Sequence, residues 1–136
     1  MKKAIVMLIS ILAIGLCLSG CSATYYFNYT KMLNETERIE IISINELGEA
    51  TLLKALNTEE MEGILSGLSE IKFIRTSSGV NTNPRGLTLK IYYKNSDYGF
   101  INHNTSVRYN NNHKRVGGMR IFGSEEAFAE LVSEFL

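Results

Sequence analysis

The sequence contains little of the chemistry that metal sites and nucleophilic catalysis require. Its 136 residues include two histidines, two cysteines and a single aspartate, Asp97. His103 and His113 lie ten positions apart, whereas zinc sites use three or four clustered ligands. No glycine-rich phosphate loop, Gly-x-Ser-x-Gly elbow or His-Glu-x-x-His motif is present. We therefore expect no catalytic residue, no metal and no cofactor.

The sequence also lacks an overall excess of charge of either sign. The formal net charge is zero, so no general basic character points to nucleic acid as a partner. Apolar residues make up 45% of the chain and charged residues 21%, which is typical of a folded protein rather than a disordered one. The length favours a single domain.

The N-terminal segment is organised differently from the rest of the chain. Lys2 and Lys3 are followed by residues 4–18, a stretch of 15 residues without a charge. A helix needs about 20 residues to span a bilayer, whereas the apolar region of a signal peptide has about 7–15. The stretch ends in Leu18-Ser19-Gly20-Cys21, where an aliphatic residue and two small residues precede a cysteine.

This arrangement resembles the lipobox of bacterial lipoprotein precursors. The resemblance implies cleavage between Gly20 and Cys21, a diacylglyceryl thioether on Cys21 and further fatty acylation of the new amino terminus. It also implies an exported protein held by lipid on the outer side of the cell membrane, or in an outer membrane where the cell has two. The alternatives are an ordinary signal peptide with an accidental cysteine, and a short buried helix.

Lipid attachment and signal-peptide cleavage would also remove both cysteines as free thiols. Cys17 would leave with the signal peptide, and the sulfur of Cys21 would carry lipid. The mature chain would then contain no free thiol. Disulfides, a cysteine zinc site and a cysteine nucleophile would all be excluded.

Three segments follow from this interpretation. Residues 1–20 form a cleaved signal peptide, residues 21–36 a lipidated tether and residues 37–136 a single α+β domain. The aromatic residues at 25–29 suit a spacer near lipid headgroups. The alternative is that they form a strand at the edge of the domain.

Hydrophobic periodicity predicts the elements of the domain. Alternation predicts a strand at 37–44 and a second at 49–56. Asn57 and Glu60 have the spacing of a helix-capping box, followed by the apolar helix face Met61, Ile64, Leu65 and Leu68. A short strand at 71–75 and a loop at 76–86 precede four predicted strands, at 87–94, 98–102, 105–110 and 114–122.

A last helix is expected from Ser124, with acidic residues in its first turn. Its apolar face comprises Ala127, Phe128, Leu131, Val132 and Phe135. The predicted fold class is therefore α+β, a mostly antiparallel sheet with two helices packed on one face. The other face would be open to solvent or to a partner.

Charge is segregated along the chain. Residues 34–70 carry a net charge of −7, and residues 72–120 carry +8. Strand alternation places Lys90 and Tyr92 on the open face. If the apolar residues of the following strands point inward, Arg108 and Arg120 join them there. These four residues form a candidate surface for an anionic envelope ligand or an acidic protein; the alternative is an ordinary solvated face.

We therefore expect a membrane-anchored lipoprotein whose small non-catalytic domain binds an envelope component or a protein partner. One alternative is an immunity- or inhibitor-type lipoprotein that neutralises a toxin or hydrolase. Another is a small hydrolase that uses Asp97, His103 and glutamate side chains.

Overall fold

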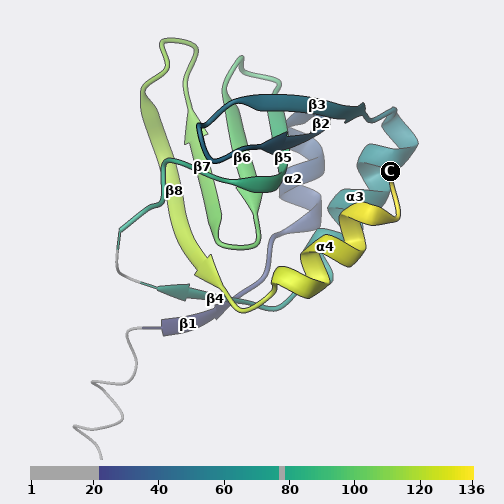
Figure 1. Ribbon diagram of the computed structural model, residues 1–136. Helices are drawn as coiled ribbons and strands as arrows, with labels where there is room; N and C mark the ends of the chain where they lie inside the picture. The colour runs from purple at the N-terminus through teal and green to yellow at the C-terminus, as the bar shows by residue number, and fades with distance from the viewer. Residues whose placement is uncertain (1–21, 77–78) are drawn as a thin grey trace, which may run out of the picture.

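The computed structural model describes residues 22–76 and 79–136. The predicted signal peptide and lipobox, residues 1–21, lie outside these ranges. Figure 1 shows the arrangement of the elements. In chain order they are β1 (Ser22–Tyr25), α2 (Tyr29–Glu35), β2 (Thr36–Ile44), β3 (Ala50–Ala55), α3 (Thr58–Glu70), β4 (Phe73–Thr76), β5 (Gly86–Tyr93), β6 (Tyr98–Asn102), β7 (Thr105–Tyr109), β8 (Arg115–Phe122) and α4 (Glu125–Ser133).

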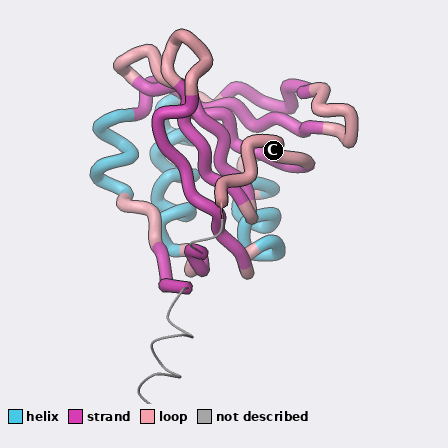
Figure 2. Tube along the Cα trace, turned by 90° about the vertical axis from the view of Figure 1, so that its left-hand side faces the viewer, coloured by secondary structure: helices cyan, strands magenta, loops and turns pink. Residues whose placement is uncertain are grey.

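The strands form one sheet, and this corrects the predicted fold class. Eight strands pair in the order β1-β4-β8-β7-β6-β5-β2-β3, and every neighbouring pair is antiparallel. Strands take up 43% of the described residues and three short helices 26%. The fold is thus dominated by its sheet, with three helices against it where two were expected. In Figure 2 the helices lie behind and beside the strands.

The third helix and the extra strand come from the segment expected to be a tether. Phe27 is buried, and its ring meets the ring of Phe73 edge-on at 5.5 Å. The Asn28 side chain then caps α2 by accepting a hydrogen bond from the backbone N–H of Lys31. The expectation of a tether is wrong for residues 22–36, because these residues form β1, α2 and the start of β2 and because Tyr25, Phe27 and Tyr29 pack in or against the core. The alternative of an edge strand is nearer to the structure, in which β1 is an edge of the sheet.

The rest of the element order follows the sequence closely. Asn57 and Glu60 form the predicted reciprocal capping box at the start of α3. The four apolar residues of its predicted face are all buried. Strands β5 to β8 form the predicted meander, each paired with the next.

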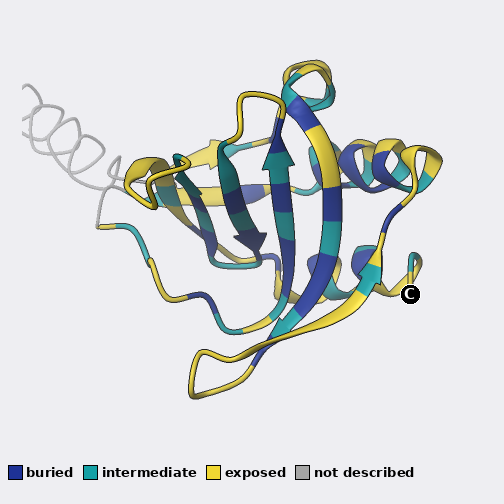
Figure 3. Ribbon diagram, turned by 90° about the horizontal axis from the view of Figure 1, so that it is seen from above, coloured by how far each residue is buried: buried dark blue, intermediate teal, exposed yellow. Residues whose placement is uncertain are grey.

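The core lies between the helices and one face of the sheet, here called the inner face. Along β5, Leu89, Ile91 and Tyr93 are buried on this face, and Figure 3 shows buried residues alternating with less buried ones along the strands. The opposite face, here called the outer face, carries the residues between them. Residues that are nearly or fully buried in the core are contributed by α3, α4 and the strands: Ile39, Ile41, Ile64, Leu65, Leu68, Phe73, Leu89, Ile91, Ile101, Ile121, Phe128 and Val132.

Candidate functional site

The outer face is covered at one end and open at the other. The segment 81–85 crosses the covered end, where the carbonyl of Asn81 accepts a hydrogen bond from the Thr105 hydroxyl at 2.9 Å. Pro84 is buried there, as are Thr88 and Asn102 of the strands beneath. The open end lies toward the β5–β6 and β7–β8 turns, which are at the top of Figure 1. A ligand can therefore reach the sheet at this end.

The open end contains a hollow of about 620 Å³, here called the outer hollow. Its side chains come from three adjacent strands and from the two turns that join or follow them. Side chains on the strands of a sheet are positioned more firmly than side chains on a loop. The lining residues are Lys90, Tyr92, Ser96, Tyr98, Phe100, Tyr109, Asn111 and His113.

The aromatic rings of the outer hollow are held by strand register. Tyr98 of β6 lies directly opposite Tyr109 of β7, and their rings stack at 5.4 Å between centroids with an angle of 22°. Phe100, two residues along β6, meets Tyr98 edge-on at 6.0 Å and Tyr109 at 6.3 Å. Cross-strand aromatic pairs of this kind stabilise a sheet. The rings are only partly buried, so they also present apolar surface to solvent.

Two turn residues in unusual backbone conformations border these rings. Ser96 has φ of 73° and His113 has φ of 62°, a region that side chains other than glycine seldom adopt. The imidazole Nδ1 of His113 lies 2.8 Å from the Tyr98 hydroxyl, so the histidine turn is tied to the ring cluster. Burial raises the pKa of the Tyr109 phenol above its ordinary value.

Lys90 supplies the positive charge of the outer hollow. Its ammonium nitrogen lies 5.0 Å from the ring centroid of Tyr92, 5.8 Å from that of Tyr98 and 5.9 Å from that of Phe100. Among the described residues, no carboxylate forms an ion pair with it. Glu40 lies opposite Lys90 on β2, but its carboxylate pairs with Arg38 at 3.4 Å. The hollow therefore combines ring faces with a cation that forms no ion pair with any described carboxylate.

Arg108 was expected on the same face as Lys90, and this is wrong. Arg108 pairs with Gly99 in register, and Tyr109 pairs with Tyr98, so Arg108 points to the inner face. Its guanidinium lies 3.9 Å from the ring centroid of Tyr93. It also forms ion pairs with Asp97 at 2.8 Å and with Glu35 at 3.4 Å. Two carboxylates thus already neutralise its charge.

Glycine explains how an arginine fits on the inner face. A Cβ atom at Gly99 would lie 2.6 Å from the carbonyl oxygen of Val107 and 3.4 Å from the ring of Tyr93. The missing side chain leaves room for Arg108 to lie along that ring. Burial raises the pKa of Tyr93 to about 12, although the nearby Arg108 cation opposes this shift. Because Arg108 points to the inner face, its neighbours Val107 and Tyr109 point to the outer face rather than to the core.

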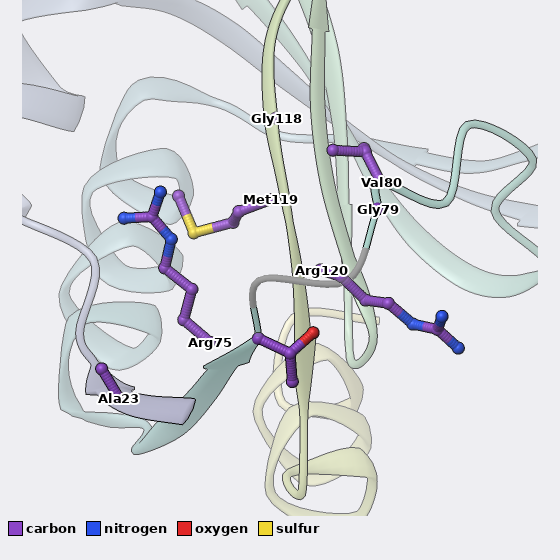
Figure 4. A pocket seen from close by; sticks show the side chains of 8 residues that line it. Ala23, Arg75, Gly79, Val80, Gly118, Met119 and Arg120 are labelled. Carbon is purple, nitrogen blue, oxygen red and sulfur yellow. The ribbon is translucent and has the colours of Figure 1, made fainter. Parts of the chain in front are cut away.

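Arg120 lies on the outer face as expected, but away from the outer hollow. It pairs with Thr105, which is four residues along β7 from Tyr109, a distance of roughly 14 Å. A second hollow of about 460 Å³ lies beside it, lined by Arg75, Met119 and Arg120 among others. Figure 4 shows Arg75 and Arg120 pointing to opposite sides of β8. Their guanidinium groups do not converge, so this hollow is a poor anion site.

The residues proposed for the hydrolase alternative are not brought together. Asp97 immediately precedes β6, and His103 immediately follows it. A five-residue strand separates its ends by roughly 17 Å, so the two side chains cannot act on one bond. Within residues 22–76 and 79–136, no group of three or more histidine, cysteine, aspartate or glutamate side chains is placed to hold a metal ion.

Strand alternation correctly places Lys90 and Tyr92 on the outer face, but it did not lead to Tyr98, Tyr109 or His113. Alternation at 98–102 places Tyr98 and Phe100 on one side of β6, and this signal was available. An outward Arg108 requires Tyr109 to point to the core, and the structure has the opposite phase along β7. A one-residue error in phase moves every side chain of a strand to the other face. In comparisons with known proteins, no family model, curated protein or solved structure matches this chain.

Proposed function

We propose that the chain is an exported lipoprotein, anchored by lipid on Cys21, whose domain binds an anionic envelope component in the outer hollow. The observation that carries the binding part is the position of Lys90. An ammonium group lies among three partly exposed rings without an acidic partner among the described residues. The lipobox, Leu18-Ser19-Gly20-Cys21, carries the anchoring part.

The charge of the outer hollow favours an anion over a cation. An aromatic cluster attracts cations through its ring faces, but here the Lys90 ammonium already occupies that position. A cationic ligand would be repelled by it. A carboxylate or phosphate would gain a charge-assisted hydrogen bond in a site partly shielded from water.

The shape of the outer hollow favours a ligand with flat apolar faces and polar edges. The rings of Tyr98, Phe100 and Tyr109 offer such faces. Ser96 and Asn111 add hydroxyl and amide groups at the rim. An acidic sugar of the envelope has both properties, because C–H faces of the sugar ring stack on aromatic rings while its carboxylate or phosphate pairs with lysine.

Capture from envelope extract tests the binding part. Immobilised wild-type chain, a Lys90→Glu variant and a Lys31→Glu control are compared at low and high salt. Lys31 lies on α2, on the helix side of the molecule, so the control makes the same charge change away from the outer hollow. Wild type and control should retain the same acidic carbohydrate, and Lys90→Glu should lose it.

Equal retention by Lys90→Glu would exclude the outer hollow as the binding site. Retention of one protein instead of carbohydrate, lost in Lys90→Glu, would favour the inhibitor-type alternative. High salt should weaken the interaction, because the screening length between exposed charges falls from about 10 Å at 0.1 M salt to about 3 Å at 1 M.

Labelling with fatty acid tests the anchoring part. The wild-type chain should incorporate the label and fractionate with membranes, and Cys21→Ala should do neither. Label retained by Cys21→Ala would exclude the lipobox interpretation. Among the described residues no helix is long and apolar enough to cross a membrane.

A further inference from the structure

A second surface lies on the outer face, at the end of the sheet opposite the outer hollow. Here β1, β4 and β8 pair side by side. Thr24, Ile74 and Phe122 form one row across these strands, and Thr76 and Arg120 belong to the next row on the same face. The row between them, with Arg75 and Ile121, belongs to the inner face. We call this surface the base; it lies at the bottom of Figure 1.

The base exposes two neighbouring apolar side chains. Ile74 is 43% exposed and Phe122 37% exposed, although they are direct cross-strand neighbours. The guanidinium carbon of Arg120 lies 4.8 Å from the ring centroid of Phe122. A basic group beside exposed apolar side chains is the composition of a surface that lies in a membrane interface.

Exposed cations border the base. Lys72, just before β4, is exposed like Arg120, whereas Arg75 of β4 points to the opposite face of the sheet. No described acidic side chain forms an ion pair with any of the three. Glu70, Glu130 and Glu134 line a hollow together with Lys72, so Arg120 is the cation of the base that lies apart from these acids. Anionic lipid headgroups attract such an exposed cation.

The chain enters the domain at the base. β1 begins at Ser22, so Cys21 is one residue away, a Cα separation of about 3.8 Å. A lipid on its sulfur would have no tether and would hold the base against the bilayer. Ser22 pairs with Thr76, and Thr76 with Arg120, so the lipid would emerge beside the exposed residues of the base.

We propose that the base lies on the surface of an anionic lipid bilayer, with Ile74 and Phe122 in the interface and Arg120 against the headgroups. This rests on the proposed lipid attachment to Cys21. In this orientation β8 leads away from the bilayer toward the β7–β8 turn. The outer hollow is then held roughly 25 Å from the membrane, the length of an eight-residue strand.

The absence of tryptophan from the sequence allows a direct test. Phe122→Trp places a single tryptophan in the base. Asn112→Trp places one at the far end of β8, in an exposed turn. Each full chain is purified with its lipid and reconstituted in vesicles of phosphatidylcholine and phosphatidylglycerol, with and without brominated acyl chains as quencher.

The base tryptophan should lose about half its emission or more in brominated vesicles, since side chains at an interface reach about 5–10 Å into the headgroup and acyl boundary. The turn tryptophan should lose almost none. Adding Arg120→Glu to Phe122→Trp should restore much of the emission, as should replacing phosphatidylglycerol by phosphatidylcholine. Ile74→Trp, in the same row, provides a second reporter if Phe122→Trp fails to fold.

Two results would overturn this orientation. One is equal quenching of both reporters, and the other is no quenching of the base reporter. The mass of the N-terminal peptide from the same preparation separates the two proposals. Lipid present without quenching contradicts the base orientation alone, whereas absence of lipid contradicts the anchoring and the orientation that rests on it.

Discussion

The two faces of the sheet use neighbouring residues of one strand for different purposes. On β5, Ile91 is fully buried on the inner face, and Lys90 and Tyr92 on either side of it belong to the outer hollow. The inner face is sealed by helices, whereas the open end of the outer face is not. Because alternate side chains of a strand point to opposite faces, stability and recognition can be changed separately within three residues.

Two cations sharpen this comparison. Arg108 and Lys90 come from nearby strands and were expected on the same surface. Arg108 lies on the inner side, where Asp97 and Glu35 neutralise it. Lys90 lies among rings with no ion pair to a described residue. The charge available to a ligand therefore depends on which face a cation occupies, and a count of basic residues does not reveal it.

The largest expected difference is between the losses of stability in an Ile91 variant and in a Tyr92 variant. Ile91→Ala should lower the free energy of unfolding by about 2–5 kcal/mol, because it leaves a cavity in the core. The guanidinium carbon of Arg38 lies 3.5 Å from the ring centroid of Tyr92. Tyr92→Ala should lower the free energy of unfolding by about 1 kcal/mol, mostly by removing this contact. Urea denaturation followed by circular dichroism measures both. Similar losses for the two variants would contradict the division between the faces.

The next prediction compares alanine variants of the two cations, Arg108 and Lys90. Arg108→Ala should lower the free energy of unfolding by about 1–2 kcal/mol, because it removes charge-assisted hydrogen bonds from a partly buried site. Lys90→Ala should leave stability within about 0.5 kcal/mol of wild type. Capture of the envelope component should show the reverse order, with Arg108→Ala unchanged and Lys90→Ala impaired. Loss of capture in Arg108→Ala, in a folded protein, would move the binding site to the inner side.

A smaller effect concerns the backbone at the rim of the outer hollow. His113→Gly and His113→Val both remove the contact with Tyr98, so the difference between them reports the positive φ alone. The valine variant should be less stable than the glycine variant by about 1–2 kcal/mol. Thermal unfolding of the pair measures this, and equal midpoints would show that the turn changes conformation at no cost.

The smallest effect lies away from both faces. A hydrogen bond from Lys54 and one from the backbone of Asn57 lower the pKa of the Glu60 carboxyl below its usual value. A carboxyl with a lowered pKa in the folded protein stabilises it at neutral pH, and this contribution is lost as the pH falls through that pKa. Glu60→Gln should therefore have a slightly lower unfolding midpoint than wild type at neutral pH. The gap should narrow in acid; a gap that widens there would contradict the sign.

Local signals in the sequence predicted much of the fold. The capping residues Asn57 and Glu60 sit three apart on one turn, and the meander strands alternate or end at turn residues. Such patterns depend on neighbours in the chain. The segment 22–35 could not be assigned in this way, because Phe27 becomes part of the core only through contact with Phe73, 46 positions later in the sequence.

The candidate site also depends on contacts between residues that are distant in the sequence. Lys90 and Tyr92 were placed correctly because the apolar residues around them fix the phase of β5. The phase of β7 depends on Gly99 of its neighbour and on the carboxylates of Glu35 and Asp97, which make an inward Arg108 favourable. Side-chain polarity along β7 alone favours the opposite phase.

The central claim is that the outer hollow holds the ligand, and hydroxyl-radical footprinting of the folded chain tests it most directly. The chain is oxidised with and without the soluble, lipid-free fraction of the envelope, and each aromatic residue is quantified by mass spectrometry. Tyr26, 51% exposed and next to β1, serves as an internal control for radical dose. We predict that oxidation of Tyr98, Phe100 and Tyr109 falls while that of Tyr26 stays unchanged. Unchanged oxidation of all four residues, with the component shown to be bound, would contradict the claim.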